Sequence, residues 1–247
     1  MLPRFVLGTR TCCCCDCVHE NYIFLCSHTL IKEQNGVTEA AFMICRGQTS
    51  KIDLSLVHTR QKTYLSFSSF YWGMIADIHI ESGLENFDGW KAMSVRTYRA
   101  KFSYLKAAYL KNIREIIQNF PPLEQETLDE KWITIEGNFI FLWASQLSHA
   151  VYNLMQSPKS KPADGLFRVM MVRDHCSRFT LAKILTSIRS GQQTAFKEVE
   201  CIDCVAYRLV SLSDGSNFVL DGEIIESGPI QACMLPSALN VFYQPPP

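Results

Sequence analysis

Glycine is sparse and evenly spread along this 247-residue chain, which holds 12 glycines with no two closer than six positions. The loops G-x-G-x-x-G and G-x-x-x-x-G-K, whose backbone amides wrap nucleotide phosphates, therefore cannot occur. The hydrolase motifs G-x-S-x-G and H-E-x-x-H are also absent from the sequence. The sequence thus predicts no self-contained triphosphate or hydrolase site of these types.

The sequence also has no excess of positive or negative charge and no long hydrophobic run. Lys+Arg and Asp+Glu both number 24, so the formal net charge is +0, which argues against a nucleic-acid partner held by general phosphate neutralisation. The longest apolar runs, such as Ala40–Cys45 and Phe139–Ala144, fall far short of the ~20 residues of a spanning helix, and the first residues lack the apolar core of a secretory leader. A hydrophobic share of 47% instead indicates a folded globular protein.

Cysteine is abundant, with 11 in total, and five of these crowd into positions 12–17. The odd count and the adjacent positions predict reduced thiols in the cytoplasm. For this cluster, Cys12–Cys17 with His19, zinc binding and thioester lipidation are functional options. We favour an atypical segment, 1–35, without defined structure, because nothing beside the cluster supports either chemistry. Cys201-x-x-Cys204 resembles half of a zinc site, but without a second pair we interpret it as buried or edge thiols.

Residues 36–247 are expected to form one domain that is rich in strands. The alternation of Lys51–Leu56 predicts a half-buried strand, with Tyr64–Ser68 as its hairpin partner. A second hairpin is predicted from Trp132 to Leu142, with its turn at Glu136–Asn138. Further strands are expected near 99–105, 167–172, 199–212, 217–220 and 230–243.

Helices are fewer. Leu181, Ile184, Leu185 and Ile188 repeat at helical spacing and predict a helix over 177–190 that ends at Gly191. Residues 106–131 are polar and predict a helix followed by an exposed loop. The layout indicates an α+β lobe dominated by antiparallel sheet.

Several motifs, taken in order, resemble a known family. They are Trp72–Ser82, Arg96–Arg99, Phe139–His149, Met171–Arg173 with Ser177-Arg178, and Val205–Leu209 followed by Val219–Glu223. Over residues 40–243 the chain resembles the C-terminal lobe of sphingosine kinases, within the diacylglycerol-kinase-like lipid kinases.

The resemblance implies a β-sandwich-like lobe that buries a sphingoid chain, without the family's N-terminal α/β lobe. That missing lobe carries the glycine-rich phosphate-binding motif and the catalytic base, so we assign no catalytic residue and no metal ligand here. The family reaction transfers the γ-phosphate of ATP, with Mg²⁺, to the primary hydroxyl of a sphingoid base.

Two sets of site residues follow from the resemblance. Asp221, Gly222 and Glu223 form the triplet that reaches the nucleotide; from the sequence alone they equally fit an ordinary Asp-Gly hairpin turn. The residues expected to contact the lipid are Met74, Ile75, Asp77, Ile78, His79 and His149. His79 stands where the family usually carries a head-group aspartate, and a histidine brings no reliable negative charge near pH 7. The resemblance also implies that some of Phe139, Phe141, Leu142, Leu181 and Leu185 line the slot for the acyl chain. All of these apolar residues equally fit a packed core, and the sequence cannot separate the two.

We therefore expect the lipid-binding lobe of a sphingosine-kinase-like protein that is inactive alone. The alternative is a non-catalytic lipid-binding or regulatory module, and a third option is an incomplete gene product. Expected partners are a sphingoid lipid, a membrane surface contacted peripherally, and a full-length kinase or a second copy; no nucleic acid is expected. The expected location is the cytoplasm with peripheral membrane association.

Overall fold

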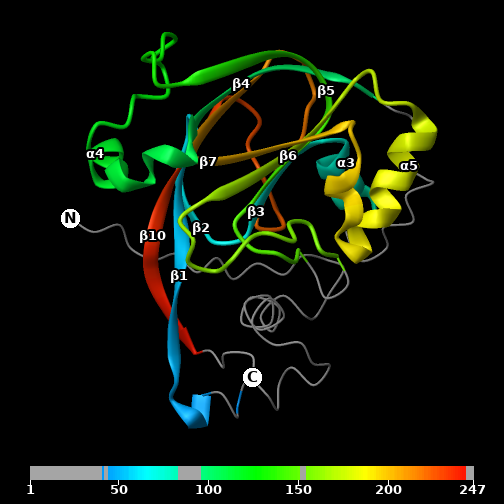
Figure 1. Cartoon of the computed structure of the whole chain (residues 1–247). Coiled ribbons are helices and arrows are strands. Elements are labelled where there is room, and N and C mark those ends of the chain that lie inside the picture. Colours follow the sequence, from blue (N-terminus) through cyan, green and yellow to red (C-terminus); the bar gives the residue numbers. More distant parts are fainter. Residues whose placement is uncertain (1–40, 42–43, 83–95, 151–153, 243–247) are drawn as a thin grey trace.

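The computed structural model describes residues 41, 44–82, 96–150 and 154–242. Ten strands form the main secondary structure of this part (Figure 1). They are β1 (Thr49–His58), β2 (Thr63–Ser66), β3 (Ser69–Gly73), β4 (Tyr98–Lys106), β5 (Ile133–Ser145), β6 (Phe167–Arg173), β7 (Val199–Ser211), β8 (Phe218–Leu220), β9 (Glu223–Ile225) and β10 (Ile230–Phe242). The α-helices are α3 (Met74–Ser82), α4 (Ile113–Gln118) and α5 (Arg178–Ser187). Three 3₁₀ helices span Ala107–Asn112, Ile188–Ser190 and Gln192–Ala195.

All of the strand pairs are antiparallel, in the order β2-β1-β10-β7-β4-β5-β3-β8-β9, with β6 bridging β5 and β7. The two long strands β5 and β7 serve both halves of the structure. The first half of β5 pairs with β4 and its second half with β6, and the change of partner falls at Phe139. In β7 the change falls at Cys204, where pairing passes from β6 to β4. The strands β4, β5, β6 and β7 thus form a closed ring of pairs, and the ten-stranded sheet folds back on itself into a β-sandwich-like lobe, as the sequence predicts.

Aromatic rings fill the interior of the sandwich. Phe70 packs edge-on against Phe218 at a ring-centroid distance of 5.5 Å, and Phe167 packs edge-on against Tyr207 at 4.9 Å. These rings belong to a first core cluster that also contains Phe139 and Leu142. Such edge-to-face contacts are favoured by the ring quadrupoles and give a densely packed centre.

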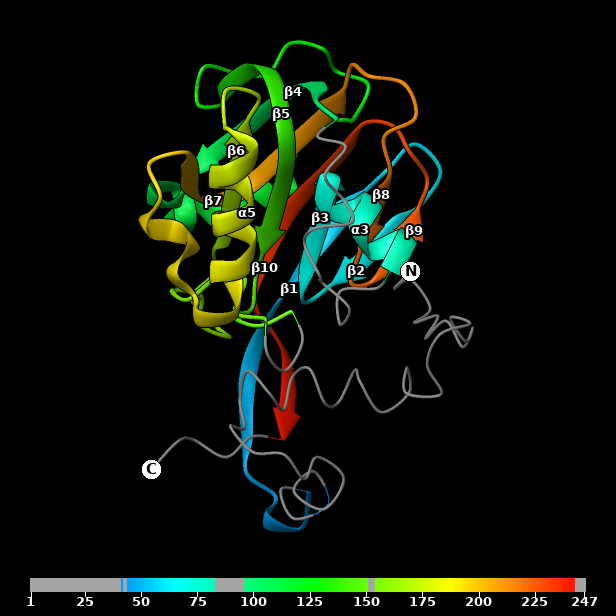
Figure 2. The same ribbon diagram turned by 90° about the vertical axis from the view of Figure 1, so that its right-hand side faces the viewer.

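The helices α3 and α5 cover the outer face of β3, β5 and β6 (Figure 2). Their apolar side chains join those of the strands in a second cluster, which we call the α3–α5 cluster. It consists of Tyr71, Met74, Ile75, Ala76, Ile78, Ile140, Phe141, Trp143, Ala150, Leu154, Met170, Val172, Cys176, Leu181, Ile184, Leu185, Ile188, Val199 and Val219. The predicted helix over 177–190 is confirmed: the Ser177 side chain caps it, and Gly191 follows it with a φ of 72°.

Gly73 makes the entry into α3 possible. Its φ of +75° lies in the left-handed region, and a Cβ there would come within 2.6 Å of the Ile140 carbonyl oxygen. Glycine suits this position because it lacks a Cβ and so tolerates both the positive φ and the close approach of β5.

Two elements differ from their prediction. The turn expected at Glu136–Asn138 is wrong, because these residues continue β5 and pair with Lys101, Ala100 and Arg99 of β4. The helix expected in 106–131 is confined to a 3₁₀ turn and the short α4, whose residues are all at least partly exposed.

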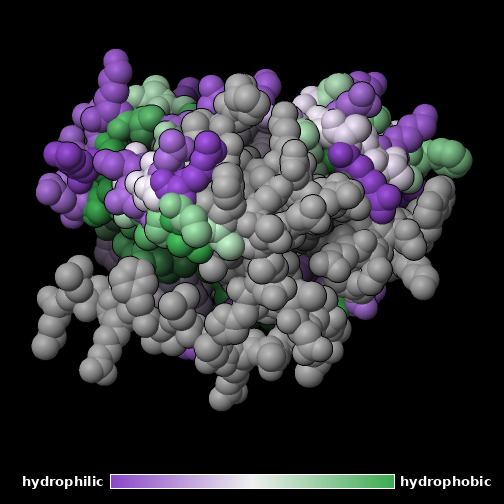
Figure 3. Space-filling view, turned by 90° about the horizontal axis from the view of Figure 1, so that it is seen from below, coloured by the Kyte–Doolittle hydropathy of each residue, from purple (hydrophilic) through white to green (hydrophobic). Residues whose placement is uncertain are grey.

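Seen from below, hydrophobic residues gather on the side where Figure 1 places α4, bordered by hydrophilic ones (Figure 3).

No helix within the described ranges is long and apolar enough to cross a membrane. The segment 1–35, with its cysteine cluster, lies outside the described residues.

Candidate functional site

The helix α3 faces the turn between β8 and β9, and one hydrogen bond joins them. His79 Nε2 lies 2.8 Å from the carbonyl oxygen of Gly222. Because a carbonyl oxygen only accepts, the Nε2 atom must carry the proton and donate. The structure therefore brings together a predicted lipid residue and a predicted nucleotide residue that are far apart in the sequence.

Asp221 holds this turn against the β2–β3 connection. Its carboxylate accepts hydrogen bonds from the backbone amides of Phe67, Ser68 and Ser69 at 2.9–3.0 Å. The Ser66 hydroxyl donates to it as well, at 2.9 Å. Burial raises the pKa of Asp221, and these hydrogen bonds offset part of that rise. The contacts give Asp221 a structural role, and its predicted contact with a nucleotide stays a prediction.

The other two residues of the triplet differ from Asp221. Gly222 has a φ of 87°, and Asp221 also has a positive φ, of 50°. Two consecutive positive values are typical of the two-residue hairpin turn that Asp-Gly favours, so the predicted turn is confirmed. Glu223 is exposed at the start of β9, which leaves its carboxylate open to a ligand from solvent.

Asp77 is fully engaged within the protein. One carboxylate oxygen accepts from the Tyr98 hydroxyl, and the other accepts from Asn217 Nδ2 at 2.9 Å. Burial and this contact raise the pKa of Tyr98, which keeps its hydroxyl protonated as a donor. These bonds fasten the first turn of α3 to β4 and to the residue before β8.

The apolar residues predicted for the lipid lie together in the α3–α5 cluster. Met74, Ile75 and Ile78 come from α3, and Leu181 and Leu185 come from α5. Phe141 joins them, whereas Phe139 and Leu142 point into the first cluster inside the sandwich. The structure therefore assigns these side chains, which the sequence could not separate, to two different cores.

His149 borders the same region. It directly precedes Ala150, a member of the α3–α5 cluster, and its Nδ1 atom lies 2.9 Å from the Ser148 hydroxyl. Its predicted lipid contact stays a prediction.

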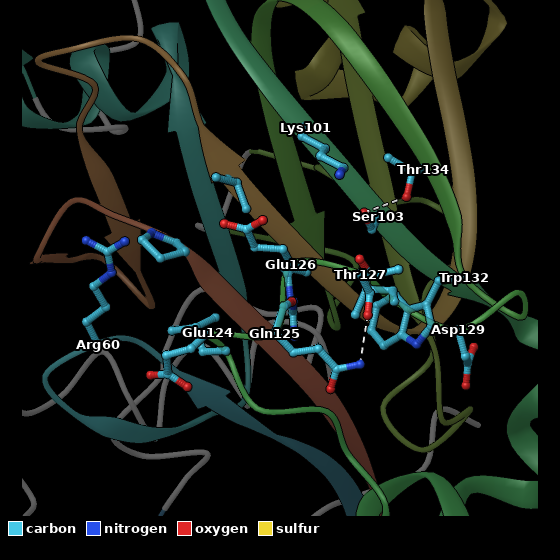
Figure 4. Close-up of a pocket in the computed structure, with 15 residues that line it drawn as sticks. Arg60, Lys101, Ser103, Glu124, Gln125, Glu126, Thr127, Asp129, Trp132 and Thr134 are labelled. Atoms are coloured by element: carbon cyan, nitrogen blue, oxygen red, sulfur yellow. Dashed lines mark hydrogen bonds between the residues drawn. The ribbon is translucent and has the colours of Figure 1, made fainter.

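A pocket that the sequence did not predict lies on the outer face of β4, β5 and β7 (Figure 4). It has a volume of about 620 Å³ and is bordered by the loop 123–129. Arg208 is one of its lining residues and is buried, and its guanidinium donates to Gln231 Oε1 and to the carbonyl oxygen of Pro122. The one sequence signal for this pocket is a charged residue, Arg208, inside the apolar stretch Val205–Leu209 of β7. Both charge signs line this pocket, and the residues predicted for the lipid and the nucleotide do not.

The described residues contain no group of three or more His, Cys, Asp or Glu side chains placed to hold a metal ion. Cys201 is exposed, while Cys204 is fully buried, which raises its pKa. Since residues three apart in a strand point to opposite faces, this pair does not converge on one ion. Of the nucleotide triplet, the exposed Glu223 fits a contact with Mg²⁺, and Asp221 does not, because its carboxylate already accepts from four protein donors.

Comparisons with known proteins agree with this fold. Residues 82–243 match the model of the YegS C-terminal NAD kinase beta sandwich-like domain. Sphingosine kinase 1 of Homo sapiens is 25% identical, and the match covers 88% of this chain and 63% of that protein. Sphingosine kinase 1 of Caenorhabditis elegans is 24% identical, and the match covers 85% of this chain and 56% of that protein. A crystal structure of a putative diacylglycerol kinase from Bacillus anthracis superposes with a TM-score of 0.62 at 13% identity, covering 89% of this chain and 65% of that one.

The chain spans about three fifths of the length of these sphingosine kinases. The matched region coincides with their C-terminal part, as the sequence motifs predicted. The chain therefore belongs to the family of YegS C-terminal NAD kinase beta sandwich-like domains and covers the C-terminal lobe of the sphingosine and diacylglycerol kinase family.

Proposed function

We propose that this chain is the lipid-binding lobe of a lipid kinase of the sphingosine kinase type and is inactive alone. With a nucleotide-binding lobe, the assembly would transfer the γ-phosphate of ATP to the primary hydroxyl of a sphingoid base. The observation that supports the proposal is the α3–α5 cluster, which gathers the predicted lipid residues of two helices beside the His79–Gly222 contact.

An amphiphile would enter the α3–α5 cluster with its chain between α3 and α5. Met74, Ile75 and Ile78 would contact the chain from one side and Leu181 and Leu185 from the other. Transfer of the chain from water is favourable by roughly 0.8 kcal/mol for each buried methylene. The polar head would then lie at the α3 end, near His79 and the turn at Gly222.

This chain supplies little for the nucleotide. ATP and Mg²⁺ would provide the phosphoryl group and its charge neutralisation. Here only the exposed Glu223 is open to that ion within the predicted triplet. The sequence has no glycine-rich phosphate loop, so phosphate binding would depend on another lobe. Peripheral contact with a membrane is part of the proposal, because the lipid must come from a bilayer.

The alternative is a module that binds lipid without catalysis, alone or paired with a full-length kinase. It is favoured by the two carboxylates of the predicted site that are held by protein donors, Asp77 and Asp221. Lipid binding without ATP binding would support this alternative.

The test uses the full chain with sphingosine, ATP and Mg²⁺. Calorimetry with sphingosine carried by methyl-β-cyclodextrin should show saturable binding, and a phosphorylation assay should show no turnover above background. Ile78→Trp should fill the α3–α5 cluster and weaken binding at least about tenfold. Leu105→Trp is the matched control: Leu105 and Ile78 are each 4% exposed, but Leu105 lies on β4 in a separate core cluster with Trp132.

Circular dichroism establishes that both variants fold. Equal binding by the wild type and Ile78→Trp would place the lipid elsewhere, and robust turnover by the wild type would refute the inactive lobe.

A further inference from the structure

The pocket bordered by the loop 123–129 lies apart from the sites that the sequence predicts. It opens on the outer face of β4, β5 and β7 (Figure 4), whereas α3 and α5 cover β3, β5 and β6. Its volume of about 620 Å³ is within the usual range of small-ligand pockets and equals that of a sphere about 10 Å across. One small molecule inside it can therefore touch side chains on opposite sides.

The strands supply an unpaired cation to this pocket. Lys101, on β4, is half-buried and lines the pocket. Its cross-strand neighbour Glu136 already pairs with Arg99 at 2.8 Å. No hydrogen bond or ion pair joins the Lys101 ammonium to any other residue in the part of the chain that the structure describes. The ammonium is therefore open to an anionic ligand.

A pair of hydroxyl groups lies beside this cation. Ser103 Oγ and Thr134 Oγ1 are 2.9 Å apart on the neighbouring strands β4 and β5. Figure 4 shows the Lys101 side chain pointing toward them. Because one hydroxyl donates to the other, only one of the two hydroxyl hydrogens is used, and the second is left for a ligand. An ammonium and a hydroxyl donor thus meet at one place.

The loop 123–129 presents the opposite charge to the same pocket. Glu124 and Glu126 line it and are exposed, and within the described ranges neither side chain has an ion pair or a hydrogen bond. Asp129 lines it too, and one of its oxygens accepts from the Lys131 amide at 2.9 Å. Carboxylates and the Lys101 ammonium therefore share one pocket without pairing with each other.

The loop is held in place by neutral contacts and does not need a ligand to fix it. Arg208 Nη2 donates to the carbonyl oxygen of Pro122, and Gln231 Nε2 donates to that of Pro121, both at 2.8 Å. Arg208 also donates to Gln231 Oε1. The pocket is thus formed in advance, which lowers the entropic cost of binding a small ligand.

A ligand of one charge sign would be attracted by one side of this pocket and repelled by the other, whereas a zwitterion complements both. Phosphate accepts several charge-assisted hydrogen bonds at once, which suits an ammonium beside a free hydroxyl. An organic ammonium is favoured beside carboxylates and an aromatic ring, and Trp132 lines the pocket near the loop.

We propose that this pocket binds a small zwitterion of the phosphocholine or phosphoethanolamine type. Its phosphate contacts Lys101 and the free hydroxyl hydrogen, and its ammonium contacts Glu126 and the ring of Trp132. The zwitterion is carried by a phospholipid head or by a free phosphoester. The inference goes beyond the proposed function and does not depend on it, because the α3–α5 cluster takes no part.

The experiment titrates the full chain with phosphocholine, with choline and with inorganic phosphate, followed by calorimetry. Phosphocholine should bind saturably, and each of its two halves should bind at least about tenfold more weakly, because either half engages one side of the pocket alone.

Matched variants test the two sides separately. Lys101→Met removes the ammonium, and its control is Lys106→Met, an exposed lysine of the same strand outside the pocket. Glu126→Gln removes a carboxylate, and its control is Glu130→Gln, an exposed residue just after the loop that does not line the pocket. Lys101→Met and Glu126→Gln should each weaken phosphocholine binding about fivefold or more, and the controls should bind like the wild type.

Sedimentation with phosphatidylcholine vesicles distinguishes the two sources. Vesicle binding that free phosphocholine displaces supports the inference with a lipid head as ligand, and phosphocholine binding without vesicle binding supports it with a free phosphoester. The inference is overturned if the folded wild type does not bind phosphocholine, if choline or phosphate alone binds as tightly, or if Lys101→Met and Glu126→Gln bind like their controls. Sphingosine binding is measured separately, so each of these results leaves the proposed function standing.

Discussion

The carboxylate of Glu226 accepts a hydrogen bond from the Tyr64 hydroxyl at 2.6 Å, and this contact joins the two ends of the sheet. Tyr64 lies on β2 and Glu226 directly follows β9, the first and last strands in the pairing order. The Thr59 hydroxyl donates to the same carboxylate. A side chain thus connects two edge strands that no backbone pairing joins among the described strands, which protects both edges from other chains.

Glu226→Gln should destabilise the fold by about 1 kcal/mol, because a neutral acceptor replaces a carboxylate in a partly exposed place. Burial opposes ionisation of Glu226, but the hydrogen bonds from Thr59 and Tyr64 outweigh it and hold its pKa below the usual value. The stabilisation of the fold by ionised Glu226 is therefore complete when the pH is above the unfolded-state pKa of ~4.3. It is lost as the pH falls through the lower pKa of the folded state. Urea unfolding from pH 7 to 3 measures this; a difference between wild type and variant that widens on acidification would contradict it.

Asp221 should show the opposite pH dependence. Burial raises its pKa in the folded state, so ionisation at neutral pH counts against the fold. As the pH falls from 7 towards ~3.9, the native state takes up a proton before the unfolded chain does, and the wild type should gain stability relative to the non-titrating D221N. D221A should be less stable than D221N by about 1–3 kcal/mol, because the amides of Phe67, Ser68 and Ser69 then lose their acceptor.

The same urea titrations provide the readout. A wild type that loses stability relative to D221N between pH 7 and 4 would show that the carboxylate is needed in its ionised form.

Gly73 is constrained both by its positive φ and by the close approach of β5, whereas Gly47 has a positive φ alone and serves as a control. Gly73→Ala would adopt a φ of +75° and place a Cβ 2.6 Å from the Ile140 carbonyl oxygen. Gly47 has a similar φ of +67° with nothing within 4 Å of its Cβ position. Gly47→Ala should therefore cost about 1–2 kcal/mol from backbone strain alone, and Gly73→Ala clearly more. If urea unfolding shows equal losses of unfolding free energy for the two variants, β5 moves away from the new Cβ without a cost in stability.

Local patterns predicted most of the strands, because alternation and turn residues act over a few positions. The hairpin of β1 and β2 and the turn at Asp221-Gly222 are confirmed at the predicted places. The turn at Glu136–Asn138 failed because tertiary pairing with β4 overrides its turn-like composition. Arg173 packs over the Phe139 ring at 4.6 Å, a long-range contact on this same stretch of β5 that its composition does not reveal.

The sequence predicted which residues belong to the candidate site, but it did not predict which residues they contact. Sequence motifs placed Asp77, His79 and Asp221 near a ligand, but their partners lie more than a hundred positions away in several cases, as with Asn217 and Gly222. Such contacts arise only when the sandwich closes. The unpartnered Nδ1 of His79 likewise depends on the tautomer that the Gly222 carbonyl imposes.

Asp77 offers a test of how α3 is held in place. Asp77→Ala leaves the Tyr98 hydroxyl and the Asn217 amide without their acceptor, so stability should fall by about 2–3 kcal/mol. D77N should cost less than about 1 kcal/mol, because Asn217 can turn its amide and accept from the new side chain. The control is Asp174→Ala, an exposed carboxylate that accepts from Asn138 Nδ2 at 3.0 Å, and its effect should be close to zero.

Amphiphile binding provides the second measurement for Asp77. Since Asp77 fastens the first turn of α3, its loss should loosen Met74 and Ile78 against α5 and weaken binding of sphingosine, while D77N should restore this binding. A direct contact between the carboxylate and a head group would give another pattern: D77N would then fail to restore binding although its stability recovers. That outcome would return Asp77 to the head-group role that the family resemblance implies.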